Sequence, residues 1–310
     1  MAGFFQRLFS KNKKEKKETN NSLSSELDVD TQPLGTETIE ILSKPTALEN
    51  QLEPRQLLVG LGQSKGMQRD HNEDAIFSLT TTMVSDTSQI PFGLYIVADG
   101  MGGHKHGEMA SGIAVRGLAG HIIRKLYQPL FSLPANTPDQ SLQEIMQEGV
   151  QIAHQAILKE TPEGGTTLTA VLILGDQMTI AHVGDSRAYS IFPDGTLNVL
   201  TRDHSLVKRL EELGQITAEE AAVHPQRNVL YRALGQGESF DAEIKTSSLP
   251  HKGHLLICSD GLWGVISGDK IFEIINTEPS PEKACQKLVA AANAAGGPDN
   301  ISAILVRLPD

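Results

Sequence analysis

Four strand-length segments follow one another within residues 168–200, and only tight turns separate them. These segments are rich in Val, Ile and Leu, which favour strands, and they run over 168–174, 178–183, 187–192 and 196–200. Asp194-Gly195, between the last two segments, is a hairpin signal. Because such short connections join antiparallel neighbours, the feature predicts an antiparallel sheet and disfavours a doubly wound parallel one.

The other periodic segments place helices and strands in separate parts of the fold. Further strands are predicted over 75–79, 93–98, 254–258 and 301–306. Helix-length apolar spacing covers 108–127 and 139–159, and a third helix over 281–295 enters through Pro281 and ends at Gly296. Antiparallel strands and helices are therefore expected in separate layers, which is an α+β fold.

Residues 1–56 differ in composition from the rest of the chain. They are rich in Ser, Thr, Asn and Glu and show little periodicity, so we expect a disordered tail before a single domain over 57–310. The tip carries a lysine cluster within residues 11–17 and four apolar side chains, Phe4, Phe5, Leu8 and Phe9. A solvated terminus is the favoured interpretation, and the alternative is a short amphipathic helix that contacts anionic lipid or a partner.

Charge and cysteine content exclude several classes of function. The net charge of −11 and the pI near 5.4 argue against nucleic-acid binding, which needs an excess of Lys and Arg. No apolar run is long enough to span a bilayer. The two cysteines, Cys258 and Cys285, show no zinc or redox spacing, and a reducing cytoplasm fits them. We expect a soluble, cytoplasmic monomer.

Aspartates stand at the ends of the predicted strands. Asp99, Asp185 and Asp260 each end an apolar run, whereas Asp74 and Asp299 lead into strands. Carboxylates gathered on one rim of a sheet sandwich would repel one another unless cations neutralised them. Oxygen-only ligands select hard cations such as Mg²⁺, Mn²⁺ or Ca²⁺. Any one of these aspartates alone is better explained as a turn residue, and the joint pattern is what indicates a metal site.

The same residues belong to motifs that follow one another in a fixed order: Arg69-x-x-Asn72-Glu73-Asp74, Asp99-Gly-Met-Gly-Gly-His104, Gly107-Glu108, Gly165-Thr-Thr, Gly184-Asp-Ser-Arg187, Ser259-Asp-Gly261 and Gly297-Pro-Asp-Asn300. In these motifs the chain resembles the bacterial-type PPM, or type-2C, serine/threonine protein phosphatases over residues 58–308. The resemblance implies a four-layer sandwich of two antiparallel sheets flanked by pairs of antiparallel helices. It also implies hydrolysis of phosphoserine and phosphothreonine in proteins that serine/threonine kinases modify.

The resemblance implies a set of site residues. Asp99 would bridge two Mn²⁺ or Mg²⁺ ions that activate a water for in-line attack on phosphorus, and Asp260 and Asp299 would complete the first ion. The Gly100 carbonyl would join the second ion, where Glu73 and Asp74 would bind directly or orient waters. Asp185 matches a position that, with Asp260, holds a third and weaker ion. Asp99, Asp260, Asp299 and Arg69 would be the catalytic residues, and Arg69 would also bind the substrate phosphate. The alternative interpretation of Arg69 is a surface salt bridge.

One position departs from the pattern of many eukaryotic members. They carry a histidine directly after the Asp-Gly pair, whereas this chain has Met101, which cannot donate a proton. His104 and His106 are interpreted as loop or packing residues. The polar segment over 201–232 resembles the flap beside the family's active site, and Arg202, His204 and Arg227 are candidates to meet a phosphopeptide, with a solvated helix face equally compatible.

Two rival functions stay open at this point. A catalytically weak pseudophosphatase would bind phosphoproteins without hydrolysis, and another two-metal hydrolase would act on a different phosphate ester. A nucleotide-binding interpretation rests only on Gly60, Gly62 and Gly66, whose spacing matches neither glycine-rich phosphate motif. We reject it.

Overall fold

The structure, a computed structural model, describes residues 56–85, 88–103, 105–136, 138–237 and 240–309. These residues lie in one compact unit, Leu52–Asp310. The predictions for the N-terminal tail and its basic tip fall on residues outside the described ones. Among the described residues, no helix combines the length and the apolarity needed to cross a membrane.

Two antiparallel sheets form the centre of the unit. One has the strand order β1 (Leu58–Ser64), β11 (Ile301–Arg307), β10 (His254–Cys258), β7 (Arg187–Ile191) and β8 (Leu197–Val199). The other has the order β2 (Asp74–Ser85), β3 (Ser88–Met101), β5 (Leu168–Leu174), β6 (Gln177–Val183) and β9 (Glu243–Ser248), and the short β4 (Gly165–Thr166) pairs with β3. Every pairing is antiparallel, as the hairpin run predicted.

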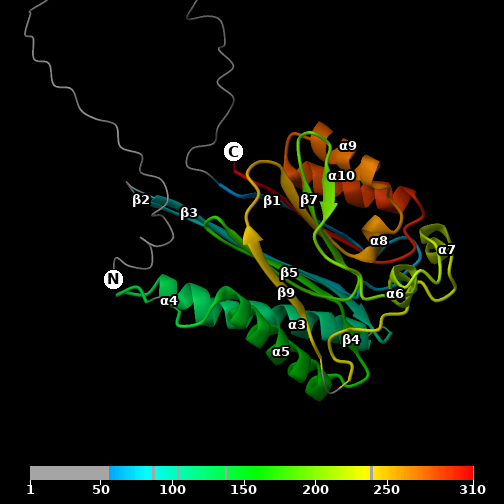
Figure 1. Cartoon of the computed structure of the whole chain (residues 1–310), viewed down its shortest axis with the longest axis horizontal. Helices are drawn as coiled ribbons and strands as arrows, with labels where there is room; N and C mark the ends of the chain where they lie inside the picture. The colour runs from blue at the N-terminus through cyan, green and yellow to red at the C-terminus, as the bar shows by residue number, and fades with distance from the viewer. Residues whose placement is uncertain (1–55, 86–87, 104, 137, 238–239, 310) are drawn as a thin grey trace, which may run out of the picture. The chain divides into compact units, whose positions relative to one another are not determined.

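Helices cover the outer faces of both sheets (Figure 1). The long helices α3 (Lys105–Ile122) and α5 (Leu142–Glu160) lie together on the side of the second sheet, and α9 (Gly268–Thr277) and α10 (Pro281–Ala294) lie on the side of the first. Shorter helical segments are η1 (Ile123–Tyr127), α4 (Gln128–Leu130), α6 (Leu206–Glu212), α7 (Ala218–Ala222) and α8 (Asp260–Trp263). The predicted four-layer α+β sandwich is confirmed.

Local sequence signals set where the long helices begin. Ser141 caps α5 by accepting a hydrogen bond from the Glu144 amide, and the Glu144 carboxylate accepts one from the Ser141 amide in return. Ser280 caps α10 directly before Pro281, whose fixed φ suits the first helical position. Gly296, with φ of +113°, follows the last turn of α10 and turns the chain toward β11.

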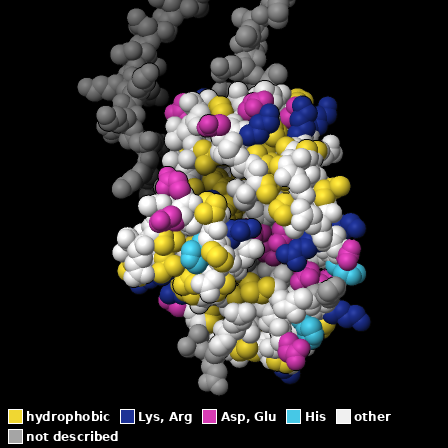
Figure 2. Space-filling model, turned by 90° about the vertical axis from the view of Figure 1, so that its right-hand side faces the viewer, with side chains coloured by type: hydrophobic (Ala, Val, Ile, Leu, Met, Phe, Trp, Pro, Cys, Tyr) yellow, Lys and Arg dark blue, Asp and Glu magenta, His cyan; other side chains and the backbone are white. Residues whose placement is uncertain are grey.

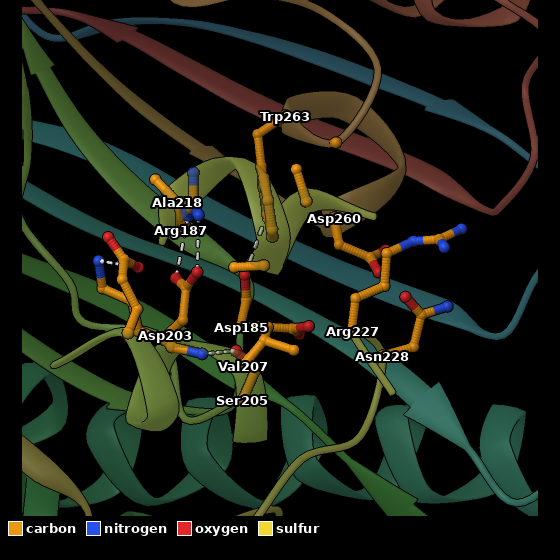
Figure 3. Close-up of a pocket in the computed structure, with 15 residues that line it drawn as sticks. Asp185, Arg187, Asp203, Ser205, Val207, Ala218, Arg227, Asn228, Asp260 and Trp263 are labelled. Carbon is orange, nitrogen blue, oxygen red and sulfur yellow. Dashed lines mark hydrogen bonds and ion pairs between the residues drawn. The ribbon is translucent and has the colours of Figure 1, made fainter. Parts of the chain in front are cut away.

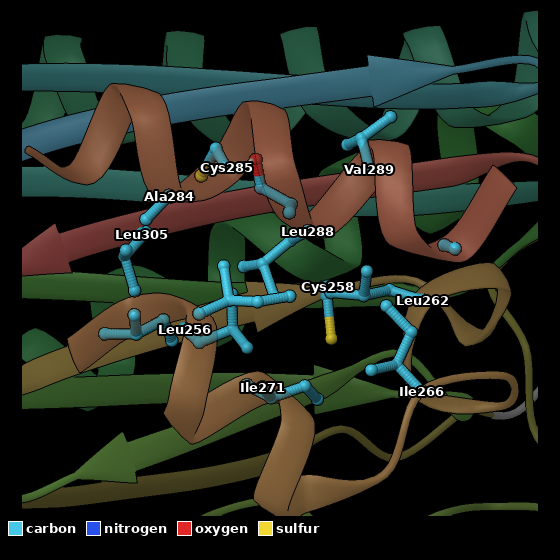
Figure 4. Packing of buried hydrophobic residues seen from close by; sticks show 14 of the residues in the cluster. Leu256, Cys258, Leu262, Ile266, Ile271, Ala284, Cys285, Leu288, Val289 and Leu305 are labelled. Carbon is cyan, nitrogen blue, oxygen red and sulfur yellow. Dashed lines mark hydrogen bonds between the residues drawn. The ribbon is translucent and has the colours of Figure 1, made fainter. Parts of the chain in front are cut away.

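Apolar side chains fill both the space between the sheets and the space under the helices. Tyr95, Val97, Val171, Ile257 and Ile304 pack between the two sheets. A second cluster, in which α9 and α10 pack on the first sheet, is shown in Figure 4 and includes Leu256, Cys258, Ile271, Cys285 and Leu288. Burial on this scale provides the main driving force for folding.

Several elements differ from their predicted bounds. The helix predicted over 108–127 is α-helical only to Ile122 and continues as the π-helical η1, and β1, β9 and α9 were not predicted. β1 escaped notice because Gly60 and Gly62 weaken a strand pattern. Their role is packing, since a Cβ at Gly60 would lie 2.1 Å from the Pro281 carbonyl carbon in α10.

Candidate metal centre

A cavity of about 230 Å³ opens at one end of the two sheets. Its lining contains most of the residues predicted for the site, namely Arg69, Glu73, Asp99, Gly100, Asp185, Asp260 and Asp299. Asp74 does not line the cavity, but it stands directly opposite Asp99 in the pairing of β2 with β3. The strand-end aspartates therefore converge from both sheets, as the sequence pattern indicated.

Strand register explains this convergence. β2 begins at Asp74 and β3 nears its end at Asp99, so an antiparallel pair sets both carboxylates at one end. In the other sheet, Asp260 follows β10 and Asp299 precedes β11. These two strands also pair antiparallel, which sets both residues at one end of their sheet.

The backbone at Asp99 is fixed by the two threonines of the Gly165-Thr-Thr motif. The Asp99 amide donates to Thr167 Oγ1 at 2.9 Å, and the Asp99 carbonyl accepts from the Thr167 amide and from Thr166 Oγ1, each at 2.9 Å. The motif was noticed in the sequence, but no role was predicted for it. Its hydrogen bonds hold the Asp99 backbone in place at the end of β3.

Glycines allow close backbone approach on the wall formed by α3. A Cβ at Gly100 would lie 2.2 Å from the Gly107 carbonyl oxygen and 2.6 Å from that of Glu73. A Cβ at Gly107 would lie 2.0 Å from Glu73 Oε2, so the first turn of α3 packs directly on that carboxylate. Only glycine fits at either position without displacing its neighbours.

Two buried carboxylate oxygens in this region have no hydrogen-bond partner among the described residues. Asp74 is 8% exposed; its Oδ2 accepts from Ser259 Oγ at 2.8 Å, whereas its Oδ1 is unpartnered. Asp260 Oδ1 is unpartnered as well. A buried carboxylate oxygen without a donor is costly, and a cation satisfies it. The orphaned oxygens and the all-oxygen donor set fit Mg²⁺ or Mn²⁺.

Burial and mutual repulsion both raise the pKa values of these carboxyl groups. Desolvation, partly offset by hydrogen bonds from hydroxyl groups, raises the pKa of Asp74 to about 7. Desolvation and the neighbouring Asp299 raise the pKa of Asp260 to about 6. The pKa values of Asp99 and Asp185 are raised well above their ordinary range, again chiefly by burial. Bound cations would reverse this effect by favouring the ionised forms.

Among the described residues, no three His, Cys, Asp or Glu side chains are already arranged around one point as ligands. At the rim, Arg69 Nη2 pairs with Asp299 Oδ2 at 2.6 Å. The other oxygen of Asp299 accepts from the Asn300 amide at 2.8 Å. The salt bridge that was the alternative interpretation of Arg69 therefore exists, but it lies in the cavity wall, and the Arg69 side chain is 51% exposed.

Asn300 organises the loop that carries Arg69 and Glu73. Its Oδ1 accepts from the Glu73 amide at 2.8 Å, and its Nδ2 donates to the carbonyls of Lys65 and His71 at 2.9 and 2.8 Å. Sequence reasoning missed this role, although Asn300 closes the Gly297-Pro-Asp-Asn motif. The sequence signal that could have revealed this role is the position of Asn300 directly after Asp299.

Asp185 lies between this cavity and a second one. Its side chain is buried, and its carbonyl accepts from Trp263 Nε1 at 3.0 Å. The Arg187 guanidinium stands 3.5 Å from the centre of the Trp263 ring and donates to both carboxylate oxygens of Asp203, at 2.9 and 2.6 Å. Figure 3 shows this arrangement, in which Arg187 and Asp203 lie on one side of Asp185 and Asp260 on the other.

The flap, residues 201–232, contains α6 and α7. Two of its three predicted phosphopeptide contacts are engaged elsewhere: Arg202 pairs with Glu212, and His204 is buried, with its Nδ1 accepting from the Gly184 amide at 3.1 Å. Arg227 is exposed. Figure 2 shows this face, on which acidic and basic side chains gather around a hollow.

Of the neighbouring loop residues, Met101 lines the first cavity, and Gln236 Nε2 lies 3.6 Å from its sulfur. His106 is exposed and does not line the cavity. His104 lies outside the described residues.

Comparisons with known proteins agree with one another. A family model for protein phosphatase 2C matches residues 60–301. The serine/threonine phosphatase stp of Listeria welshimeri is 36% identical over 247 residues, which cover 78% of this chain and 92% of that protein. The crystal structure of the serine/threonine phosphatase PstP/Ppp of Mycobacterium tuberculosis is similar with a TM-score of 0.68 and 30% identity, covering 82% of this chain and all of that one. A structure of the PstP catalytic domain in complex with two manganese ions is similar with a TM-score of 0.66 and 29% identity, over 82% of this chain and 99% of that one.

Proposed function

Because the chain belongs to the protein phosphatase 2C family, we propose that its strand-end cavity performs the family's reaction with the residues described above. The protein is a serine/threonine protein phosphatase and hydrolyses phosphoserine and phosphothreonine with the help of divalent cations. The observation that carries the assignment of residues is the convergence of the predicted aspartates on one cavity within the matched region. A pseudophosphatase role is not supported, since the relatives are named as phosphatases.

Asp99 is the central ligand in this proposal. It stands opposite Asp74 across the strand pair and lines the cavity together with Asp260 and Asp299. We assign Asp99 to both cations and Asp260 and Asp299 to the first. Cations held there supply Lewis-acid activation of water and neutralise charge on the phosphoryl oxygens.

The second cation would be held from the α3 side. The Gly100 carbonyl and the Glu73 carboxylate are both at the cavity wall, and Asp74 stands behind them with an unpartnered oxygen. Asp185, which lines the cavity beside Asp260, would hold a third and weaker cation. Mn²⁺ and Mg²⁺ both suit oxygen donors of this kind.

Arg69 would bind the phosphate of the substrate. Its guanidinium stands at the rim, half exposed, and needs only to exchange Asp299 for phosphate oxygens, which it can engage two at a time. Met101 lines the cavity and has no transferable proton, so we assign protonation of the leaving alkoxide to water rather than to the side chain at this position.

The remaining assignments concern the protein as a whole. We propose a monomer that acts in the cytoplasm on proteins phosphorylated by serine/threonine kinases, with the catalytic domain over 57–310 and a flap that shapes access to the cavity. The buried, unpaired thiols of Cys258 and Cys285 support a reducing compartment. The N-terminal tip remains a candidate for contact with anionic lipid, on the basis of its sequence alone.

A direct assay tests this function. The purified chain should release phosphate from p-nitrophenyl phosphate and from a phosphothreonine peptide in Mn²⁺ or Mg²⁺, and a chelator should stop both reactions. Nuclease substrates should remain intact in the same preparation. Absence of hydrolysis of both phosphate substrates across a range of Mn²⁺ concentrations would contradict the proposal.

A further inference from the structure

A second cavity, of about 330 Å³, lies between the flap and α8 (Figure 3). Asp185, Asn228 and Asp260 line both this cavity and the first one. The two spaces therefore adjoin. A peptide whose phosphate occupies the first cavity must place neighbouring residues nearby, since each residue of an extended chain advances by only about 3.3–3.6 Å.

Most charges that line the second cavity are already neutralised. Arg187 is held by Asp203, and Lys208 pairs with Glu211 at 3.0 Å. Within the part of the chain that the structure describes, Arg227 is the one cationic side chain of this lining without an ion pair. It is exposed, and Figure 3 places it on the side of the cavity where Asp260 lies.

Part of the remaining wall is apolar, and Ser205 and Asn228 add polar side chains to it. The apolar part comes from α6, α7 and α8, through Val207, Ala218, Ala221 and Trp263. A side chain with an aliphatic stem and a charged end suits such a surface, because the stem packs on the wall while the end reaches a counter-ion.

Resting on the proposed function, we infer that this cavity receives a substrate residue close to the phosphorylated one, and that Arg227 selects an acidic side chain there. The protein carries a net charge of −11, which disfavours the approach of acidic peptides. An unpaired cation beside the reaction site favours an acidic side chain at one position of the substrate peptide, against this general repulsion. Arg202 and His204, the other candidates on the flap, are engaged with Glu212 and Gly184.

Charge reversal with matched peptides tests the inference. Two pairs of phosphothreonine peptides would carry Glu or Lys, one pair just before and one pair just after the phosphothreonine. The parent protein, Arg227→Glu and Arg209→Glu would be compared by kcat/KM, with each value divided by that variant's own rate on p-nitrophenyl phosphate. Arg209 is a matched control because it is exposed on α6 and does not line the cavity.

In at least one pair, the parent and Arg209→Glu should prefer the Glu peptide by about fivefold, as expected for an exposed to half-buried ion pair, mainly through KM. Arg227→Glu should reverse that preference, and added salt should reduce it in the parent. A preference that Arg227→Glu leaves equal to that of Arg209→Glu in both pairs would overturn the inference. A parent that hydrolyses neither the peptides nor p-nitrophenyl phosphate would instead contradict the proposed function.

A second measurement remains informative if Arg227→Glu does not fold. Trp263, the one tryptophan of the chain, lines the cavity, so its fluorescence reports occupancy. Titration with a non-hydrolysable phosphonate peptide carrying Glu should change the fluorescence of the parent at about fivefold lower concentration than with Arg227→Gln. Equal titration midpoints for the two proteins would overturn the inference.

Discussion

The two adjoining cavities are built in different ways. In the first, carboxylates stand at the ends of paired strands, and backbone hydrogen bonds fix residues such as Asp99. In the second, the flap is joined to the body by the buried side-chain pair of Arg187 with Asp203 and by a backbone hydrogen bond from the His204 amide to the Gly184 carbonyl. The comparison shows that chemistry is placed on the rigid sheets, whereas contacts that can differ between substrates are placed on the flap.

The largest effect is expected at the centre of the first cavity. Asp99→Asn should lower kcat on p-nitrophenyl phosphate by more than about 100-fold in saturating Mn²⁺, because it weakens the ligand assigned to both cations. The amide should leave the fold intact, as circular dichroism can check. Near-normal turnover would show that strand register does not determine the chemistry.

A smaller effect, on stability, is expected at the contact between the flap and the first sheet. Arg187→Gln leaves the buried Asp203 carboxylate without its partner and should lower the free energy of unfolding by about 2 kcal/mol, measured in urea. Arg187→Lys should fall in between, because it keeps the charge but loses the two-point contact. Equal stability of all three proteins would indicate that the flap is held by other contacts.

Arg69 lies at the boundary between chemistry and recognition. Arg69→Ala should raise KM for a phosphothreonine peptide by about tenfold, with a lesser change in kcat, since it removes phosphate binding more than water activation. Initial-rate kinetics measure both parameters. An unchanged KM would leave Arg69 as only the salt-bridge partner of Asp299.

The smallest effect is expected at a half-buried pair within the flap. Lys208→Ala removes the i,i+3 partner of Glu211 and should change the free energy of unfolding by less than about 0.5 kcal/mol. A loss above 1 kcal/mol, on the order of that expected at Arg187, would remove the distinction between the buried Arg187–Asp203 pair and the less buried pairs within the flap.

Sequence reasoning could predict the elements that depend on local signals. Hairpin turns and apolar runs predicted the antiparallel layers. The aspartates before and after those runs indicated that Asp99, Asp260 and Asp299 would lie at one rim, where the structure places them. Residues that act over long sequence separations escaped it. Asn300 bonds the Glu73 amide 227 positions away, and Ser259 bonds Asp74 185 positions away, and neither contact leaves a local pattern.

The flap shows a different limit. Arg202, His204 and Arg227 are alike as polar flap residues in the sequence. In the structure, however, Arg202 forms an ion pair with Glu212, and His204 is buried. Such distinctions depend on which side chains meet after folding. Composition and spacing do not contain that information.

Mn²⁺ binding measured by isothermal titration calorimetry tests the central claim most directly. The parent chain is expected to bind at least two Mn²⁺ ions, and Asp99→Asn should lose tight binding of both, because one carboxylate is assigned to the two of them. Asp194→Asn, in a hairpin turn whose aspartate accepts from the Thr196 amide at 2.9 Å, should bind like the parent. Equal Mn²⁺ stoichiometry and affinity in the parent and Asp99→Asn would contradict the account.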